Sequence, residues 1–267
     1  MTETTLLPAI AKHQAGGTVW LRLQRPAAMN AISPGMLKEL NVALDEIESD
    51  ESVRVVVLTG TGRAFCAGAD LKAIANAAGE VHPSQVVEFV AYAGRTIERL
   101  AALAQPVIAG VNGLALAGGL ELLLASDIVV ASSAARIGDA HANYGLIPGA
   151  GGSVRLSRVV GPHMAKYLAF TGDHFPPSSP VLAGLVSEIV EPDELEARLA
   201  ELAASLADKS PLGLRRMKHL INDAPDQSLR SALATEHEAL AEQCASADFA
   251  EGIAAFAARR TPIYQGR

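Results

Sequence analysis

The sequence contains little cysteine and no long apolar run. Its two cysteines, Cys66 and Cys244, are too few and too far apart for a disulfide framework or a zinc site, and this scarcity suits a reducing cytosol. No apolar stretch reaches the roughly 18 residues that a membrane span needs, and the N-terminus lacks the charged and apolar regions of a signal peptide. We therefore expect a cytoplasmic protein without a membrane segment.

Aromatic residues and positive charge are also scarce. Aromatic side chains make up only 4% of the 267 residues, whereas alanine is abundant, which favours closely packed helices and interfaces of small residues. The net charge of −7 disfavours a nucleic acid as the main partner. A hydrophobic content of 49% against 19% charged residues is typical of a globular protein with an ample core.

The first two thirds of the chain alternate between strand and helix patterns. Ser33 is a candidate helix cap, because Pro34 follows it and apolar residues then recur at helical spacing up to Ile47. The other expected elements of this part are strands at 18–23, 53–59, 106–111, 128–131 and 185–190 and helices at 84–103 and 164–170. After Pro192 the pattern is all-helical, over 193–207, 211–222, 227–244 and 248–259. We predict an α/β core over 1–200 and a helical region over 201–267.

The segment from residue 111 to residue 121 is the most informative one. An apolar strand runs into residues with small side chains and the pair Gly118-Gly119, and an apolar helix that carries Glu121 in its first turn then begins. Bare backbone at a helix start leaves unpaired N–H groups that favour a negatively charged ligand oxygen, which is the physics of an oxyanion hole. Alternatively, the two glycines serve packing and Glu121 stabilises the helix dipole by ~0.5 kcal/mol.

Two further segments combine small residues with chemical groups. Residues 66–70 have small side chains ending in Asp70, so a ligand can lie against their backbone. Asp139 and His141 stand two apart in a glycine-rich loop, where an extended chain would place both side chains on one side. The Gly-x-Gly at 60–62 is read as a turn, because a dinucleotide site would need a third glycine at the right spacing.

These segments, in this order, resemble the crotonase (enoyl-CoA hydratase/isomerase) superfamily. The resemblance covers nearly the whole chain and rests on six collinear motifs, at residues 23–33, 65–72, 117–121, 145–152, 184–186 and 256–267. It implies an α/β fold in which ββα units wind into a spiral over 1–200, and C-terminal helices that build a homotrimer or a dimer of trimers. It also implies an acyl-CoA substrate.

The resemblance assigns roles to particular residues. The two backbone donors to the thioester oxygen fall on Ala69 and Gly118, and the candidate catalytic residues are Glu121, His141 and Asp139. The residues implied to bind the coenzyme A arm are Ala27, Ala28, Ala67, Asp70, Leu71 and Lys72, with Phe256 and Arg259 contributing from the same or a neighbouring subunit. No metal and no cofactor is expected, apart from coenzyme A as part of the substrate.

The chain departs from the family pattern at His141. Hydratases of the family hold one water between two glutamates; Glu121 matches the first, whereas His141 falls at the second. The family's simple isomerases also use a carboxylate there. Some β-diketone-cleaving relatives carry a histidine, paired with an aspartate that would fall on Ala150, and Asp139 is the acid that can orient His141 here. The proline-rich stretch 174–180 replaces the usual helix, so its shape is not carried over.

Three hypotheses follow. The leading one is a lyase that hydrates a 2-enoyl-CoA reversibly, with Glu121 and His141 positioning the water and moving protons. The first alternative is a hydrolase of C–C or thioester bonds that uses His141 as its base and Asp139 behind it. The second is a non-catalytic acyl-CoA binding protein, which would bind CoA esters without converting them.

Overall fold

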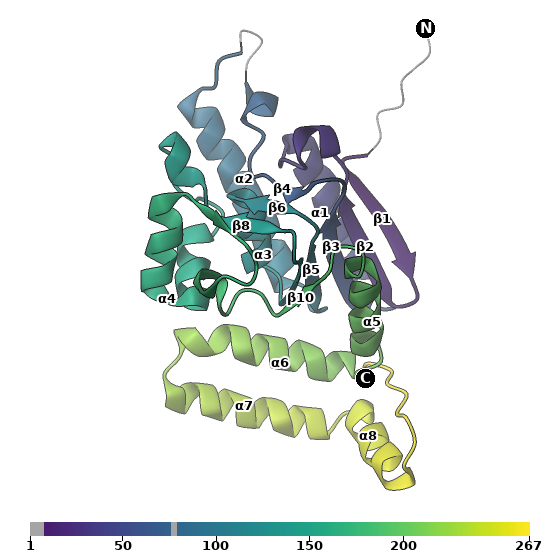
Figure 1. Cartoon of the computed structure of the whole chain (residues 1–267). Helices are drawn as coiled ribbons and strands as arrows, with labels where there is room; N and C mark the ends of the chain where they lie inside the picture. The colour runs from purple at the N-terminus through teal and green to yellow at the C-terminus, as the bar shows by residue number, and fades with distance from the viewer. Residues whose placement is uncertain (1–7, 76–78) are drawn as a thin grey trace, which may run out of the picture.

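The computed structural model describes residues 8–75 and 79–267, and its centre is a six-stranded sheet in the order β1-β2-β3-β5-β7-β10 (Figure 1). The strands of this large sheet are β1 (Ile10–Ala15), β2 (Thr18–Leu23), β3 (Val55–Gly60), β5 (Val107–Val111), β7 (Ile128–Ser132) and β10 (Glu188–Val190). Strands β1 and β2 pair antiparallel, and all the other pairs are parallel.

A smaller sheet has the order β4-β6-β8-β9. Its strands are β4 (Ala64–Cys66), β6 (Leu114–Leu116), β8 (Arg136–Gly138) and β9 (His174–Phe175). Strands β3, β5 and β7 of the large sheet are each followed by a strand of the small sheet and then by a helix. This repetition is the ββα spiral that the sequence predicts, and the expected mixed α/β fold is confirmed.

Helices pack on both faces of the large sheet, with α1 (Pro34–Ser49) and α2 (Pro83–Ala102) on one face and α5 (Leu195–Ala207) on the other. The remaining helices are α3 (Gly118–Leu124), α4 (Gly152–Thr171), α6 (Pro211–Asp223), α7 (Leu229–Cys244) and α8 (Ala247–Ala258). Ser33 caps α1 as expected, because its hydroxyl accepts a hydrogen bond from the Met36 amide at 3.2 Å. Among the described residues, no helix is both long and apolar enough to cross a membrane.

The core divides between the two faces of the large sheet. Val56 and Leu58 of β3 point into the main core with α1 and α2, whereas Val55 and Val57 point to the opposite face. There α5 covers the sheet so closely that a Cβ on Gly110 would lie 2.3 Å from a methyl carbon of Leu199. Burial on both faces explains why these strands are continuous apolar runs in the sequence.

Helix α4 corrects one sequence prediction. The expected helix at 164–170 is the second half of a helix that begins at Gly152 and bends at Gly161, where φ is 78° and ψ is 159°. Pro162 follows this bend, and the two residues interrupt the helical pattern that the sequence analysis relied on. The longer helix matters for the site, because its first turn adjoins Glu121.

The last three helices extend away from the sheets, and α6 and α7 run side by side beneath the body of the molecule (Figure 1). The C-terminal tail returns to α8, where the buried Asp248 carboxylate accepts hydrogen bonds from the Gln265 and Gly266 amides at 2.8 and 3.0 Å. The predicted boundary near residue 200 falls inside α5, and the division into 1–200 and 201–267 stays a prediction.

Candidate active site

Two backbone amides, those of Ala69 and Gly118, lie on neighbouring loops where the first and second ββα units meet. Ala69 follows β4, and a bridge to Ile32 uses the Gly68 carbonyl and the Asp70 amide at 2.8 Å each, which turns the Ala69 N–H to the other side. Gly118 is the first residue of α3 and therefore has no acceptor within the helix. Neither amide donates a hydrogen bond to any residue in the described part of the chain.

The loops that carry these amides touch. A Cβ on Gly68 would lie 2.9 Å from the Ala117 Cβ and 3.6 Å from the Gly118 nitrogen. Gly68 also has a φ of +103°, a conformation that L side chains rarely adopt. The structure thus brings together the two donors that the sequence places on separate segments, and it does so through a contact that only glycine allows.

Ala117 holds the Gly118 amide in an unusual direction. Its φ of 50° and ψ of −114° lie outside the regions favoured by non-glycine residues, at a cost on the order of 1–3 kcal/mol. The ψ angle of a residue orients the next peptide group, so this strain sets where the Gly118 N–H points. Gly119 has the packing role considered for both glycines, since a Cβ there would lie 2.1 Å from the Cys66 carbonyl oxygen.

Glu121 is buried, with 5% of its surface exposed, and one of its carboxylate oxygens is fixed by backbone. Oε1 accepts hydrogen bonds from the Ala150 amide at 2.7 Å and from the Gly152 amide at 3.0 Å. Oε2 has no hydrogen-bond partner among the described residues, yet it is not one of the fully buried unpaired atoms. The carboxylate is therefore oriented by the loop into α4 and keeps one accessible oxygen.

His141 contacts Asp139, as the sequence predicts. Nδ1 of His141 lies 2.9 Å from Oδ1 of Asp139, which also accepts the His141 backbone amide at 3.1 Å. The reason differs from the predicted one: the chain between them is not extended, because Ala140 is left-handed with a φ of 61° and folds the carboxylate back onto the next residue. His141 then begins the short 3-10 helix η3 (His141–Tyr144).

Charge links His141 to Glu121. Burial by itself would lower the pKa of His141, but the hydrogen bond and charge of Asp139 and the charge of Glu121 outweigh it and raise this pKa above its ordinary value. The Glu121 carboxylate is therefore close enough to influence the charge of the imidazole. The role of the two residues as an acid–base pair stays a prediction.

The residues expected to bind the coenzyme A arm lie in two neighbouring short helices and the strand end between them. Ala27 and Ala28 belong to η1 (Pro26–Ala28), and Leu71 and Lys72 begin η2 (Leu71–Ile74). The Ala67 amide donates to the Met29 carbonyl at 3.1 Å, which joins the two segments. Asp70 caps η2 and pairs with Arg25 at 2.7 Å, so part of its role is structural.

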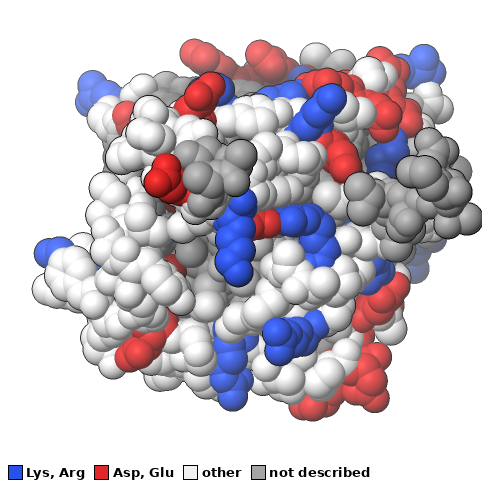
Figure 2. Space-filling model, turned by 90° about the horizontal axis from the view of Figure 1, so that it is seen from above, with Lys and Arg blue, Asp and Glu red and all other residues white. Residues whose placement is uncertain are grey.

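Figure 2 shows the face above these segments, with Lys and Arg side chains gathered near its middle. Lys72 and Ala69 are both exposed, and Arg25, which the sequence analysis did not select, holds Asp70 and also donates to the Ala31 carbonyl at 2.5 Å. Arg25 belongs to the motif at residues 23–33, where it directly precedes Pro26, so the sequence could have identified it. The sequence analysis also missed the amides of Ala150 and Gly152 that hold Glu121, because the residue type does not show which backbone N–H groups act as donors.

Phe256 and Arg259 are not brought to this site within one chain. Both lie at the end of α8, at the bottom of Figure 1, whereas β4, β6 and α3 lie in the body above. Phe256 is 85% exposed, which is unusual for a large aromatic side chain. The structure thus leaves these two residues on an outer surface of the subunit.

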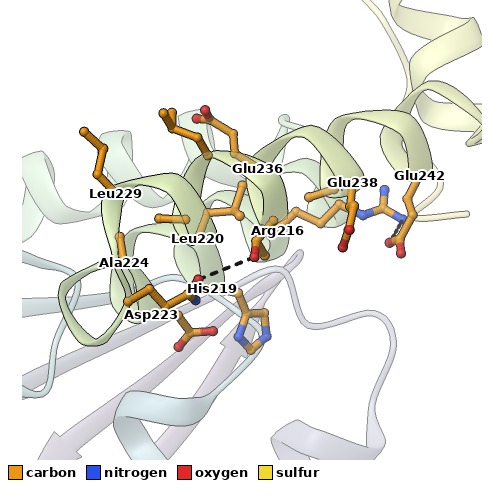
Figure 3. Close-up of a pocket in the computed structure, with 14 residues that line it drawn as sticks. Arg216, His219, Leu220, Asp223, Ala224, Leu229, Glu236, Glu238 and Glu242 are labelled. Atoms are coloured by element: carbon orange, nitrogen blue, oxygen red, sulfur yellow. Dashed lines mark hydrogen bonds and ion pairs between the residues drawn. The ribbon is translucent and has the colours of Figure 1, made fainter.

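A groove of about 410 Å³ lies elsewhere, between α6 and α7 (Figure 3). Its lining includes Leu220, Leu229 and Leu233, and Arg216 reaches across it to Glu242 at 3.6 Å. None of the predicted site residues lines it. We also find no cluster of three or more His, Cys, Asp or Glu side chains suited to a metal within 8–75 and 79–267.

Comparison with known proteins gives one consistent family. The model of the enoyl-CoA hydratase/isomerase family matches residues 13–267. The chain is 37% identical to the short-chain-enoyl-CoA hydratase of Clostridium acetobutylicum, over 93% of this chain and 94% of the relative, and 36% identical to the 2,3-dehydroadipyl-CoA hydratase of Escherichia coli, over 92% and 94%. The solved structure of an enoyl-CoA hydratase from Bacillus anthracis superposes with a TM-score of 0.92 at 37% identity, covering 97% of this chain and 100% of that one.

Proposed function

The chain belongs to the enoyl-CoA hydratase/isomerase family, and we propose that it adds water reversibly across the α,β double bond of a 2-enoyl-CoA. It is an enoyl-CoA hydratase-like acyl-CoA enzyme, a lyase. The observation that carries the proposed reaction is the pair of unpaired amides at Ala69 and Gly118 beside a buried, oriented Glu121.

In this proposal the two amides bind the thioester carbonyl oxygen of the substrate. Negative charge develops on that oxygen as the double-bond electrons move toward it, and preformed donors stabilise the charge without reorganising. Losing one such donor typically costs ~3 kcal/mol of barrier. The touching loops and the strained Ala117 support this role, because both fix the donors before substrate arrives.

Glu121 and His141 hold the water and exchange protons with it. The water oxygen bonds to the β-carbon while one of the two residues removes its proton, and the double-bond electrons pass into the enolate. The other residue then protonates the α-carbon, the carbonyl re-forms, and the product is a 3-hydroxyacyl-CoA. The accessible Oε2 of Glu121 and the effect of the Glu121 charge on the pKa of His141 support this pairing.

The coenzyme A arm lies along Ala27, Ala28, Ala67, Asp70 and Leu71, and Lys72 meets its phosphates. Phe256 and Arg259 reach the adenine end from a neighbouring subunit, which agrees with their exposure far from this site. We accordingly infer a homotrimer or a dimer of trimers. The proposal includes a cytoplasmic location and a reaction without a resident metal or cofactor, coenzyme A being part of the substrate.

The test is hydration of crotonyl-CoA by the native enzyme and by Glu121→Ala and His141→Ala. We expect measurable turnover for the native enzyme and a loss of about 10²–10⁴-fold for each variant, the usual worth of a proton-transfer group. Binding of a CoA ester should persist in all three proteins. Native turnover no faster than the uncatalysed reaction, with CoA-ester binding intact, would refute the hydratase proposal and support a binding protein.

A specific observation favours a second candidate. The hydrogen bond of 2.9 Å between Asp139 and His141 is the arrangement that orients a general base in hydrolases. A C–C or thioester hydrolase would use His141 to activate water against a carbonyl held by the same two amides. Product analysis with a β-ketoacyl-CoA distinguishes the two reactions, because hydrolysis releases a free acid whereas hydration leaves this substrate unchanged.

A further inference from the structure

Asp139 binds His141 in two ways at once. Asp139 is 1% exposed, and its Oδ1 lies 2.9 Å from the ring Nδ1 and accepts the backbone N–H of the same histidine at 3.1 Å. The left-handed Ala140 between them brings the carboxylate back beside the Nδ1 edge of the ring. One carboxylate oxygen thus holds both the ring and the backbone of His141. Together the two contacts fix the orientation of the imidazole, whereas a contact to the ring alone would leave it freer to rotate.

We propose that Asp139 is a positioning residue that presents Nε2 of His141 as the proton donor to the α-carbon; this assignment rests on the proposed hydratase function. An ionised carboxylate can only accept, so Nδ1 carries hydrogen in both charge states of the ring. Nε2 is then the nitrogen that gains and loses a proton. His141 is the catalytic residue, and Asp139 acts through it without touching the substrate.

The charges around His141 favour the protonated ring. Asp139 lies on the same segment as His141, and the negative charge of Glu121 in α3 adds to that of Asp139. The arginines of α4 nearest in sequence to this loop are paired elsewhere, Arg155 with Glu98 and Arg158 with Asp226. Because two carboxylates act on one imidazole, the raised pKa of His141 follows from the geometry, and the ring stays protonated to a higher pH than a free histidine.

The proton roles divide accordingly. Two amides occupy Oε1 of Glu121 and leave Oε2 as the oxygen that takes the proton from the attacking water. His141 then gives the Nε2 proton to the α-carbon as the enolate electrons form the new C–H bond. After one turnover Glu121 is protonated and His141 is neutral. Exchange with solvent removes the proton from Glu121 and returns one to His141 before the next turnover.

The experiment combines nitrogen-15 NMR of the histidine rings in the substrate-free enzyme with the pH dependence of crotonyl-CoA hydration, for the native protein and Asp139→Asn. In the native enzyme we expect His141 to keep Nδ1 protonated throughout and to titrate above the ordinary histidine pKa. In Asp139→Asn the pKa should fall, kcat should fall by about 10²-fold, and the limb where activity declines with rising pH should move to lower pH. The sign follows because the acid works only when protonated.

Asp127→Asn is the matched control, since Asp127 also accepts a backbone amide and a cationic side chain, from Val107 and Lys218, but lies outside the site. It should leave the His141 titration and the pH profile unchanged. The positioning role is overturned if Asp139→Asn hydrates substrate with the native pH profile, or if neutral His141 in the native protein carries its proton on Nε2. The second measurement needs no variant, so it decides even where Asp139→Asn does not fold.

Failure of the proposed function gives a different result. A native enzyme that does not hydrate crotonyl-CoA, but whose His141 keeps Nδ1 protonated and loses its raised pKa in Asp139→Asn, refutes the hydratase reaction. That outcome retains Asp139 as the residue that orients the ring and overturns only the α-carbon as the receiver of its proton.

Discussion

At the scale of single residues, the proposed oxyanion site depends on two positions with a small side chain or none. Gly68 allows the two donor loops to touch, and Ala117 carries the strain that directs the Gly118 amide. Both features fix the direction of a backbone N–H, which has no side chain of its own to adjust. The geometry of the proposed oxyanion site should therefore be sensitive to a single added methyl group.

Gly68→Ala should lower kcat for crotonyl-CoA hydration by roughly 10²-fold or more, as for the loss of one donor. The added Cβ would lie 2.9 Å from the Ala117 Cβ and push the two loops apart. Gly161→Ala is the control, because Gly161 also has a positive φ, 78°, but nothing within 4 Å of an added Cβ. Both variants should lose stability, on the order of 1–3 kcal/mol, measured by thermal unfolding. Equal losses of activity in the two would show that strain alone, and not the contact between the loops, explains the effect.

Residue-scale prediction from the sequence succeeded where chemistry follows residue type. The contact between Asp139 and His141 was predicted, although the left-handed Ala140 that produces it was not, because alanine rarely adopts that conformation and nothing in its type signals it. The free amides of Ala69 and Gly118 fall where the motifs placed them, and their role in binding stays a prediction. The amides of Ala150 and Gly152 that hold Glu121 depend on the fold of a distant loop, which local sequence does not fix.

At the scale of elements, α2 positions the loop that orients Glu121. A Cβ on Gly149 would lie 2.3 Å from a methyl carbon of Val90, and a Cβ on Gly94 would lie 3.5 Å from the Gly149 carbonyl oxygen. The loop therefore rests directly on the helix, and its next residue, Ala150, donates to Glu121. Helix α2 contributes to the site through this packing, without a predicted catalytic residue of its own.

Gly149→Ala should displace the loop from α2 and lower kcat by about tenfold or more, and Val90→Ala in the same chain should restore most of the activity. The clash involves a side-chain methyl and not backbone, and Gly149 does not have a positive φ, so removing the methyl makes room without residual strain. The measurement is a double-mutant cycle on kcat, where contacting residues typically couple by about 0.5–3 kcal/mol. Simple additivity of the two substitutions would contradict direct packing of the loop on α2.

Most of the longer elements were predictable, but the six-residue strand β1 was not, because most of its residues are exposed and give no apolar alternation. Strand β2 matches its predicted bounds, and α1, α6 and α8 begin and end within a residue or two of the expected positions. The strands β4, β6, β8 and β9 were not predicted, because two or three residues are too few to show a strand period. These strands form the small sheet and lead into the loops of the site. The sequence therefore predicted the large sheet and the helices better than the strands next to the site.

At the scale of the whole molecule, the question is where Phe256 and Arg259 act. Both stand at the end of α8, which the C-terminal tail holds through Asp248 and Glu251, and neither reaches the site of its own chain. No periodicity or motif in one chain reveals which subunit a residue serves. If these residues bind coenzyme A as proposed, they do so across a subunit interface, and that arrangement can be tested by mixing subunits.

Glu121→Gln subunits should have no turnover, and Arg259→Ala subunits should turn over with a raised KM for the CoA ester. In oligomers that contain both kinds of subunit, the sites that keep a native Glu121 all belong to subunits that carry Arg259→Ala. Only these sites contribute to the measured turnover. If Arg259 acts within its own chain, these sites still lack it and KM stays raised. If it acts across the interface, sites beside a Glu121→Gln subunit regain a native arginine, and we expect a population with nearly native KM. Arg260→Ala in place of Arg259→Ala is the control, because Arg260 pairs with Glu251 of its own chain at 2.6 Å and should not raise KM. A KM that stays raised in purified mixed oligomers would exclude the neighbour's arginine and return the adenine end of the substrate to residues of the same subunit.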